Sequence, residues 1–349
     1  MTVLLTGGAG YIGSHTAVEL LSAGYQVVLA DNCSNSSPKV LERITALSGK
    51  PAPFYQLDVT DRDSLRQVFA RHNIDAVIHF AALKAVDESV AHPLRYYRNN
   101  LDAALTLLEV MAEYNCRQLI FSSSAMVYGD PPQVPVAEDM PVGGCANPYG
   151  RSALQVEQIM LDAAAADPGL SVVLLRYFNP AGAHPSGLLG EAHSSAPDSL
   201  MTCITQVALG QRPRLSVYGA DYPTADGTGV RDYIHVTDLA KGHLAALDYC
   251  AGRQVREVFN LGAGRGYSVL ELVETFARVN QVKVPYVIAP RRPGDIAVNY
   301  ADPAKARQIL GWQAELSLED MCRDSWRWQT LNPRGYDSPV PERPFLSSH

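Results

Sequence analysis

The stretch Thr6-Gly-Gly-Ala-Gly-Tyr-Ile-Gly13 joins the first apolar run of the chain, residues 3–6, to its first amphipathic pattern, residues 12–23. Three of its glycines, Gly7, Gly10 and Gly13, are spaced G-x-x-G-x-x-G. A glycine-rich turn at the start of a helix lets the backbone approach a pyrophosphate, and the helix N-terminus offers N–H donors and a positive potential. The stretch therefore predicts a dinucleotide-binding turn.

An acidic residue strengthens this prediction. Asp31 follows the second apolar run, residues 26–30, and stands 18 residues after Gly13. A carboxylate at that place accepts both ribose hydroxyls of NAD and repels the extra phosphate of NADP. The alternative is a tight turn followed by a helix-capping aspartate. We favour NAD because a strand, a glycine turn, a helix and an acid occur together in the expected order.

The wider pattern predicts an α/β fold. Apolar runs at residues 3–6, 26–30, 54–57, 76–80, 118–122 and 171–175 alternate with helical patterns at 12–23, 64–72, 101–114 and 149–166. Such alternation indicates a Rossmann-type doubly wound parallel sheet with helices on both faces. After about residue 180 the rhythm loosens. We expect an NAD-binding domain at 1–180, a smaller α/β substrate-binding domain at 181–340 with some crossing segments, and a tail at 341–349.

Bulk composition narrows the function classes. Of 349 residues, 47% are hydrophobic and 19% charged, and the net charge is -7. This is an ordinary globular balance, and it does not suggest a nucleic-acid-binding protein. The sequence contains no run of about 20 apolar residues, so it predicts no membrane span. The six cysteines form no CxxC pair, so we expect no metal site, no disulfide framework and a reducing, cytoplasmic location.

Candidate site residues follow the apolar runs, because ligands of open parallel sheets bind at the carboxyl ends of the strands. Asp58 and Val59 follow the third run and suit an adenine contact, although an ordinary loop aspartate is the alternative. Ser124 follows the fifth run, and Tyr149 begins the next helical pattern. These two hydroxyls, on either side of a substrate hydroxyl, would make a proton-transfer pair. The substrate hydroxyl loses its proton while its carbon loses hydride to NAD.

Further motifs reveal a family resemblance. They are Asp31-Asn32, Val77-Ile-His-Phe-Ala81, Phe121-Ser-Ser-Ser-Ala125 with Val127-Tyr-Gly-Asp130, Leu175-Arg-Tyr-Phe-Asn-Pro180, Gly227-Thr-Gly-Val-Arg-Asp-Tyr-Ile-His235 and Asn260-Leu-Gly-Ala-Gly264. With the glycine turn, these make the chain resemble the UDP-glucose (UDP-galactose) 4-epimerases of the extended short-chain dehydrogenase/reductase family over residues 2–336. The resemblance implies an isomerase of galactose metabolism that holds NAD tightly and acts on a UDP-hexose.

The resemblance also implies a mechanism and an assembly. Hydride leaves C4 of the sugar, the 4-keto intermediate rotates in the site, and hydride returns to the opposite face. A homodimer is implied through helices of the first domain, for which residues 101–114 and 149–166 are the candidates. Their apolar faces would look the same in a monomer core.

Site residues are carried over position by position. Tyr149 is implied as the general base and Ser124 as its hydrogen-bonding partner. Arg231 and Arg292 suit a diphosphate because guanidinium pairs bidentately with phosphate, although surface ion pairs are the alternative. The implied cofactor-binding residues are Gly7, Gly10, Tyr11, Ile12, Gly13, Asp31, Asn32, Asn35, Ser36, Asp58, Val59, Phe80, Ala81, Ala82, Lys84, Asn99, Ser122, Tyr149, Tyr177 and Phe178. The implied substrate-binding residues are Lys84, Ser124, Met126, Tyr149, Asn179, Ser199, Leu200, Ser216, Val217, Tyr218, Arg231, Arg292, Asp295 and Asn299.

The chain departs from the family at the expected site. Ala153 stands where a lysine normally follows the tyrosine by four residues, and Met126 replaces a usual threonine. Ser199, within the divergent stretch 191–203, replaces an asparagine, and Asn299 takes a position that is often tyrosine or small. A nearby cation lowers a pKa by roughly 1–3 units, so its loss costs about ten- to a thousandfold in phenolate at neutral pH. Arg151 points to another helix face and is a poor substitute.

Several interpretations of these departures stay open. The chain is expected to be an epimerase variant with a weakened base and an altered pocket, whether natural or engineered. Alternatives are an epimerase retuned to a non-UDP or N-acetylated sugar, and a disabled homologue that only binds NAD. A 4,6-dehydratase is disfavoured because Ala125-Met126 stand where that class carries an Asp-Glu pair.

Overall fold

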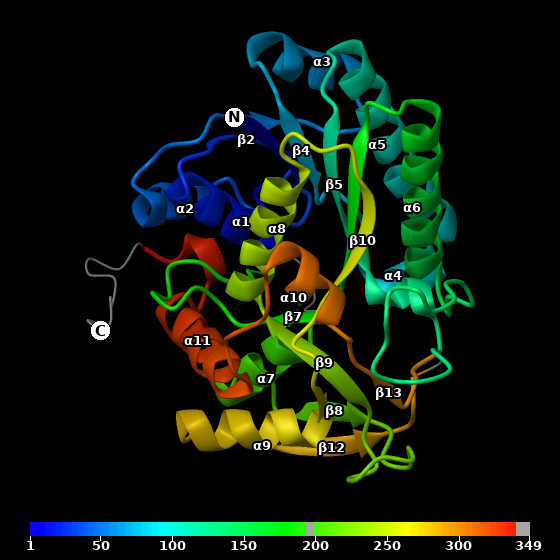
Figure 1. Cartoon of the computed structure of the whole chain (residues 1–349). Coiled ribbons are helices and arrows are strands. Elements are labelled where there is room, and N and C mark those ends of the chain that lie inside the picture. Colours follow the sequence, from blue (N-terminus) through cyan, green and yellow to red (C-terminus); the bar gives the residue numbers. More distant parts are fainter. Residues whose placement is uncertain (193–198, 293, 340–349) are drawn as a thin grey trace.

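The computed structural model describes residues 1–192, 199–292 and 294–339. The expected tail at 341–349 and residues 193–198 of the divergent stretch lie outside the described residues. The described chain forms two parts, a large sheet covered by helices and a smaller α/β part beneath it in Figure 1.

The large part is built on a parallel sheet of seven strands, which confirms the predicted fold class. Its order is β10-β6-β5-β4-β1-β2-β3. The strands are β1 (Thr2–Thr6), β2 (Gln26–Asp31), β3 (Phe54–Gln56), β4 (Ala76–His79), β5 (Gln118–Ser124), β6 (Ser171–Tyr177) and β10 (Arg256–Leu261). The first six lie within two residues of the apolar runs that predicted them. The seventh, β10, arrives from the second half of the chain and pairs with β6.

Successive side chains of each strand point to opposite faces of the sheet, and helices pack on both faces. On β1, Val3 and Leu5 pack in the apolar cluster of α1 (Tyr11–Ser22), α2 (Val40–Ser48) and α8 (Val236–Cys250). Leu4 packs in the opposite cluster, with α3 (Arg62–Arg71), α5 (Pro93–Glu113) and α6 (Pro148–Ala166). The short α4 (Val86–Ala91) precedes α5. Figure 1 shows α5 and α6 side by side along the sheet.

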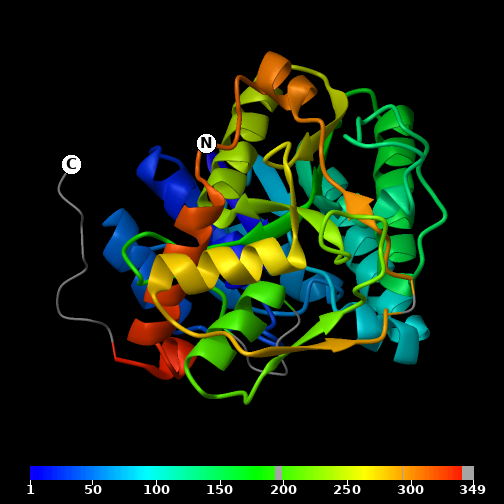
Figure 2. The same ribbon diagram turned by 90° about the horizontal axis from the view of Figure 1, so that it is seen from below.

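The smaller part has its own sheets and its own core. Strand β9 (Val230–His235) pairs with β7 (Asn179–Ala181), β11 (Gly266–Ser268) and β13 (Val298–Asn299), and β8 (Leu215–Tyr218) pairs with β12 (Tyr286–Ala289). Helices α7 (Leu200–Ala208), α9 (Val269–Asn280) and α11 (Leu318–Leu331) bury these strands in a third cluster. Helix α10 (Ala304–Leu310) packs near β10, and η1 (Ala125–Tyr128) follows β5. The short η2 (Gly335–Asp337) is the last helix of the described chain. Figure 2 shows α9 lying across this part.

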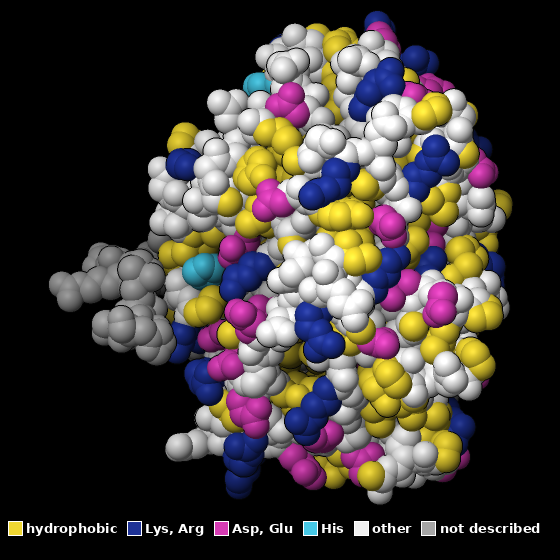
Figure 3. All heavy atoms as spheres, viewed as in Figure 1, with side chains coloured by type: hydrophobic (Ala, Val, Ile, Leu, Met, Phe, Trp, Pro, Cys, Tyr) yellow, Lys and Arg dark blue, Asp and Glu magenta, His cyan; other side chains and the backbone are white. Residues whose placement is uncertain are grey.

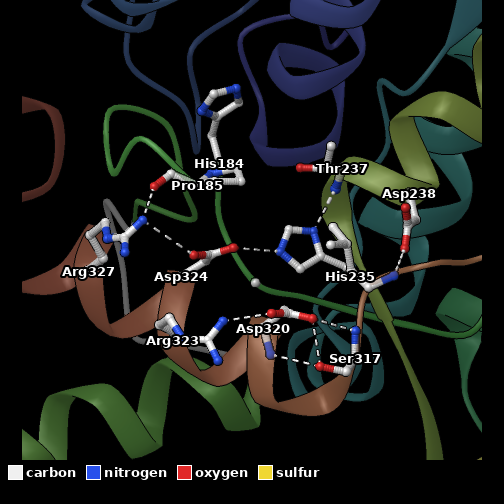
Figure 4. A network of polar contacts seen from close by, with 12 residues as sticks. His184, Pro185, His235, Thr237, Asp238, Ser317, Asp320, Arg323, Asp324 and Arg327 are labelled. Carbon is white, nitrogen blue, oxygen red and sulfur yellow. Dashed lines mark hydrogen bonds and ion pairs between the residues drawn. The ribbon is translucent and has the colours of Figure 1, made fainter. Parts of the chain in front are cut away.

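A polar network fastens α11 to the junction of the two parts, as Figure 4 shows. The His235 side chain accepts from the Thr237 N–H at 3.1 Å and so caps α8, while its Nε2 lies 3.3 Å from Asp324 Oδ2. Asp324 also lies 3.8 Å from Arg327, which donates to the carbonyl of Pro185. Because β9 leads directly into α8, this network orients the smaller part against the larger sheet.

The surface view of Figure 3 shows basic and acidic side chains interspersed over one face, with scattered hydrophobic groups between them. Within the described ranges, the chain contains no helix with the length and apolar character that a membrane crossing requires.

Candidate active site

The glycine turn packs too closely for side chains, as its sequence predicts. Gly7 has a φ of 72°, and a Cβ there would lie 2.7 Å from the backbone nitrogen of Ala81. A Cβ on Gly13 would lie 2.5 Å from the Gly7 carbonyl oxygen. Among the described residues, no side chain caps the N-terminus of α1. Its first N–H groups are therefore left for a ligand, and the narrow glycine cradle fits the pyrophosphate of a dinucleotide.

Asp31 lies against this turn at the end of β2. Its Oδ2 accepts from the Ala9 N–H at 3.0 Å, and its Oδ1 accepts from the Cys33 N–H and the Ser36 hydroxyl, each at 2.8 Å. The carboxylate holds the loop after β2 as well as facing the turn, and it caps no helix. Its remaining lone pairs suit ribose hydroxyls.

Neighbouring strand ends bring the other cofactor candidates to the same edge of the sheet. Asn32 donates to Asp58 Oδ2 at 3.1 Å, which joins the ends of β2 and β3. The register pairs Ser124 of β5 with Tyr177 of β6. The remaining candidates at or beside these ends are Asn35, Val59, Phe80, Ala81, Ala82, Lys84, Ser122 and Phe178, whereas Asn99 lies within α5.

The hydroxyls of Ser124 and Tyr149, which the sequence predicts as the reacting pair, interact at this edge. Ser124 Oγ accepts from the Met126 N–H at 3.2 Å, so its own O–H is available to donate to the Tyr149 oxygen. Tyr149 lies in the first turn of α6, which begins where the Asn147 side chain accepts from the Gly150 N–H at 2.9 Å. Burial raises the pKa of Tyr149, while the Ser124 hydroxyl and the charge of Lys84 act to lower it.

Ala153 brings no charge to this pair. It is buried and packs with Ala125, Val127 and Phe178 in a small apolar cluster. Arg151 points elsewhere, as predicted, since it donates to the Tyr97 hydroxyl at 3.1 Å and to the Cys145 carbonyl at 2.8 Å.

Lys84 is held near Tyr149 through the backbone that precedes it. The Leu83 N–H donates to Asn100 Oδ1 at 2.8 Å, and Asn100 Nδ2 donates to the Leu83 carbonyl at 3.1 Å. Asn100 Nδ2 also donates to Ser152 Oγ at 3.0 Å, and Ser152 donates to the Tyr149 carbonyl at 2.8 Å. The segment bearing Lys84 is thus tied to the turn bearing Tyr149.

The smaller part carries ten of the fourteen predicted substrate residues, and six of the ten lie on the four strands β7, β8, β9 and β13. Arg231 on β9 lies 3.7 Å from Asp295 and pairs in register with Asn299 of β13, whose Oδ1 is buried with no hydrogen-bond partner among the described residues. Arg292 lies over the ring of Tyr218, 4.0 Å from its centroid. Asn179 is on β7, which pairs with β9, and Ser216 is exposed on β8.

Two predicted substrate residues have side chains that are engaged or buried within the protein. Ser199 caps α7 by accepting from the Thr202 N–H at 3.3 Å, and it donates to Glu191 Oε2 at 2.6 Å. Leu200 follows it as the first residue of α7. Val217 is 1% exposed in the core of the smaller part, so only its backbone is available to a ligand.

Sequence reasoning missed the residues that hold the site together. Asn100 is one, and a polar residue at a buried position of an amphipathic helix was the available signal. Glu191 is another, because it reaches Lys84 and Ser199 from different parts of the chain. Within the described ranges, no group of three His, Cys, Asp or Glu side chains is arranged to hold a metal ion.

Comparisons with known proteins agree with this geometry. Residues 3–262 match the NAD dependent epimerase/dehydratase family. The chain is 55% identical over 338 residues to UDP-glucose 4-epimerase of Bacillus subtilis (strain 168), covering 97% of this chain and 99% of that relative.

Two solved structures are similar over nearly the whole chain. UDP-glucose 4-epimerase from Bifidobacterium longum, in complex with NAD+ and UDP, has a TM-score of 0.93 and 54% identity over 96% of this chain and 100% of its own. UDP-glucose-4-epimerase from Stenotrophomonas maltophila, with bound NAD and formylated UDP-arabinopyranose, has a TM-score of 0.93 and 49% identity, covering 96% and 99% of the two chains.

These comparisons confirm the predicted resemblance, the NAD dependence and the epimerase class of enzyme. They give no sign of a non-UDP sugar or of a disabled binding protein. The chain belongs to the NAD dependent epimerase/dehydratase family, among the UDP-glucose 4-epimerases.

Proposed function

We propose that the protein interconverts UDP-glucose and UDP-galactose by inverting C4 of the hexose through a transient 4-keto sugar. The observation that carries this proposal is the meeting of Ser124 and Tyr149 at the strand edge beside the glycine turn. When bound, NAD supplies the hydride acceptor and donor at C4. The sequence similarity to named UDP-glucose 4-epimerases supports the choice of substrate.

Each residue has a definite task in this proposal. The glycine turn and Asp31 hold the dinucleotide. Tyr149 removes the C4 hydroxyl proton and later returns a proton to the sugar oxygen. Ser124 donates to the Tyr149 oxygen and stabilises its anion, because a hydrogen bond to the charged form favours that form.

On the sugar-nucleotide side, Arg231 and Arg292 neutralise the diphosphate. Their guanidinium groups are suited to phosphate oxygens. Tyr218 offers an exposed aromatic face beside Arg292. Arg231 already lies near Asp295, so we expect diphosphate binding to compete with that ion pair.

The base of this enzyme is weaker than that of relatives with lysine at position 153. Ala153 lies in an apolar cluster, and burial raises the pKa of Tyr149. We therefore expect activity that rises with pH above neutrality. A pocket altered at Met126, Ser199 and Asn299 still accepts the UDP-hexose.

The test is a coupled assay with purified protein and no added NAD. Formation of UDP-galactose from UDP-glucose, with loss in Tyr149→Phe, is the expected result. The Phe variant keeps the ring and removes only the hydroxyl. Absence of turnover by the wild-type protein between pH 7 and 9.5, while NAD remains bound, would refute the proposal and favour a disabled binding protein.

We also propose a homodimer that buries the outer surface of α4 and α5. Leu94 is 80% exposed, Val90 61% and Leu105 45%, and large exposed apolar side chains on two adjoining helices suit an interface. Sedimentation equilibrium should give twice the chain mass, and Leu94→Glu should shift it to the monomer, whereas Ile309→Glu on α10 should not.

We further propose a cytoplasmic location, since an NAD-dependent enzyme that acts on a nucleotide sugar needs a compartment with both compounds. Cell fractionation with a cytoplasmic marker tests this, and enrichment in another fraction would oppose it.

A further inference from the structure

Ser124 and Tyr149 belong to different elements, so their separation depends on how α6 sits on the sheet. Ser124 ends β5, and Tyr149 lies in the first turn of α6. Glu157 lies further along the same helix and is 2% exposed. A carboxylate is rarely buried so deeply unless it is paired, and this one contacts both neighbouring strands.

The Glu157 carboxylate ties one helix to two strands. Arg176 Nη2 lies 2.7 Å from Glu157 Oε2, and Arg176 Nε donates to Oε1 at 3.0 Å, which is a bidentate pair. The Ser123 hydroxyl donates to the same Oε1. Ser123 of β5 and Arg176 of β6 are also partners in the strand register. The contact therefore fixes α6 at the residue next to Ser124.

The same arginine holds the segment on the other side of Ser124. Its guanidinium lies over the ring of Tyr128, 4.7 Å from the centroid. Tyr128 is in η1, directly after β5, and its hydroxyl donates to Asn260 Oδ1 at 2.7 Å. Ser123 precedes Ser124 and is connected to Arg176 through Glu157. Tyr128 follows Ser124 by four residues and contacts Arg176 directly.

Stability alone is a poor explanation for this arrangement. The arginine and glutamate side chains are only 6% and 3% exposed. Removing two charges from water is unfavourable, and their mutual attraction compensates for it only with very good geometry. Apolar replacements of similar volume often stabilise a protein as well or better. What the bidentate pair adds is one fixed geometry.

We propose that Ser123, Glu157 and Arg176 act as a positioning clamp that sets the separation of the Ser124 and Tyr149 hydroxyls. This inference rests on the roles proposed for those two hydroxyls. Without a lysine at position 153, the Ser124 hydroxyl is, together with Lys84, a group of the described chain that favours the Tyr149 anion, and a loosened α6 would weaken its contribution.

The test compares the clamp on α6 with a second ion pair, at the far end of the same helix. Glu157→Gln and the apolar double variant Glu157→Leu/Arg176→Met disrupt the clamp. Arg117→Ala disrupts the pair of Arg117 with Asp167, 3.0 Å apart and half exposed, between the start of β5 and the residue after α6. Rates with UDP-glucose are measured from pH 6 to 9.5, together with thermal unfolding and bound NAD.

The clamp predicts a kcat lower by about 10–100-fold in both disrupted forms, because small displacements of reacting groups have effects of that size. KM should change by less than about threefold, and the rise of kcat should move to higher pH. Arg117→Ala should match the wild type. Glu157→Gln leaves Arg176 without its charged partner, which can prevent folding. In that case the apolar double variant, which removes both charges, still tests the clamp.

Two results would overturn the inference in distinguishable ways. If Tyr149→Phe loses activity but the folded double variant keeps the wild-type kcat and pH profile, the clamp is refuted and the proposed function stands. If Tyr149→Phe remains active in the same assay, the proposed role of Tyr149 fails and the clamp fails with it.

Discussion

Lys84 and Glu191 form an ion pair between the two parts of the molecule, with Nζ 3.5 Å from Oε1. Lys84 follows β4, and Glu191 precedes α7, where its other oxygen accepts from Ser199. The charge of Lys84 acts to lower the pKa of Tyr149. The ion pair therefore links the position of this charge to Ser199, which lies on the predicted substrate side of the site.

Lys84→Met should weaken the base. Removing the positive charge raises the pKa of Tyr149, so the rise of kcat should move to higher pH and the rate at pH 7 should fall about three- to tenfold, at the low end of charge effects because Lys84 is half exposed. A pH series of kcat checks this. Lys305→Met, which breaks the 2.7 Å pair with Glu257 away from the site, is the control. An unchanged profile for Lys84→Met would exclude electrostatic support from this residue.

Ala153→Lys should strengthen the base. A lysine one turn after Tyr149 lowers the pKa of that phenol, and kcat at pH 7 should increase about tenfold or more. Ala153→Met adds similar bulk without charge and should give no increase. If both variants lower kcat equally, bulk in the cluster around Phe178 dominates and the electrostatic explanation is wrong.

Gly7→Ala should remove bound NAD. The added Cβ meets the Ala81 backbone and strains a positive φ, at a combined cost of about 2–5 kcal/mol. Gly24→Ala is the matched control, because Gly24 has a φ of 94° and nothing lies within 4 Å of its added Cβ. Gly24→Ala should lose about 1–2 kcal/mol of stability and keep its NAD. Released nucleotide and urea unfolding are the measurements, and full NAD content in Gly7→Ala would contradict the cradle.

Acid should destabilise the fold. Burial lowers the pKa of His15 to about 3 and those of His79 and His243 to about 4. The unfolded chain protonates these imidazoles near pH 6.5, so their stabilising effect is complete above that pH and is lost as pH falls toward 4. Each contributes about 1.4 kcal/mol per pH unit in that window. Asp232, whose pKa burial raises to about 6, opposes this effect, as do Glu19 and Glu138, whose pKa values burial also raises.

The check is urea unfolding at pH 7 and pH 5. From pH 7 to pH 5, the free energy of unfolding of His79→Gln should fall by roughly 2 kcal/mol less than that of the wild type. This difference is expected even if the variant is less stable than the wild type at each pH. A wild-type free energy of unfolding that is equal at the two pH values would contradict the assignment of neutral buried histidines.

Prediction from the sequence succeeded where the signal is local. The glycine spacing, the apolar runs and the start of a helix near Tyr149 are all written in neighbouring residues. The pairing of β10 with β6 could not be predicted in this way, because a run such as residues 256–261 indicates a strand but does not identify its partner strand. For the same reason, the contacts of Glu157 with Arg176 and of Lys84 with Glu191 have no sequence signature. Each depends on elements that meet only in the folded chain.

The pairing of β10 with β6 also bears on how the chain can be divided. All seven residues of β6 are buried, and one edge of the strand is covered by residues that come some eighty positions later. A fragment that stopped at residue 180 would expose that edge as a template for strand addition from other chains. We expect such a fragment to aggregate, so gene truncation cannot yield a free-standing nucleotide-binding half of this protein.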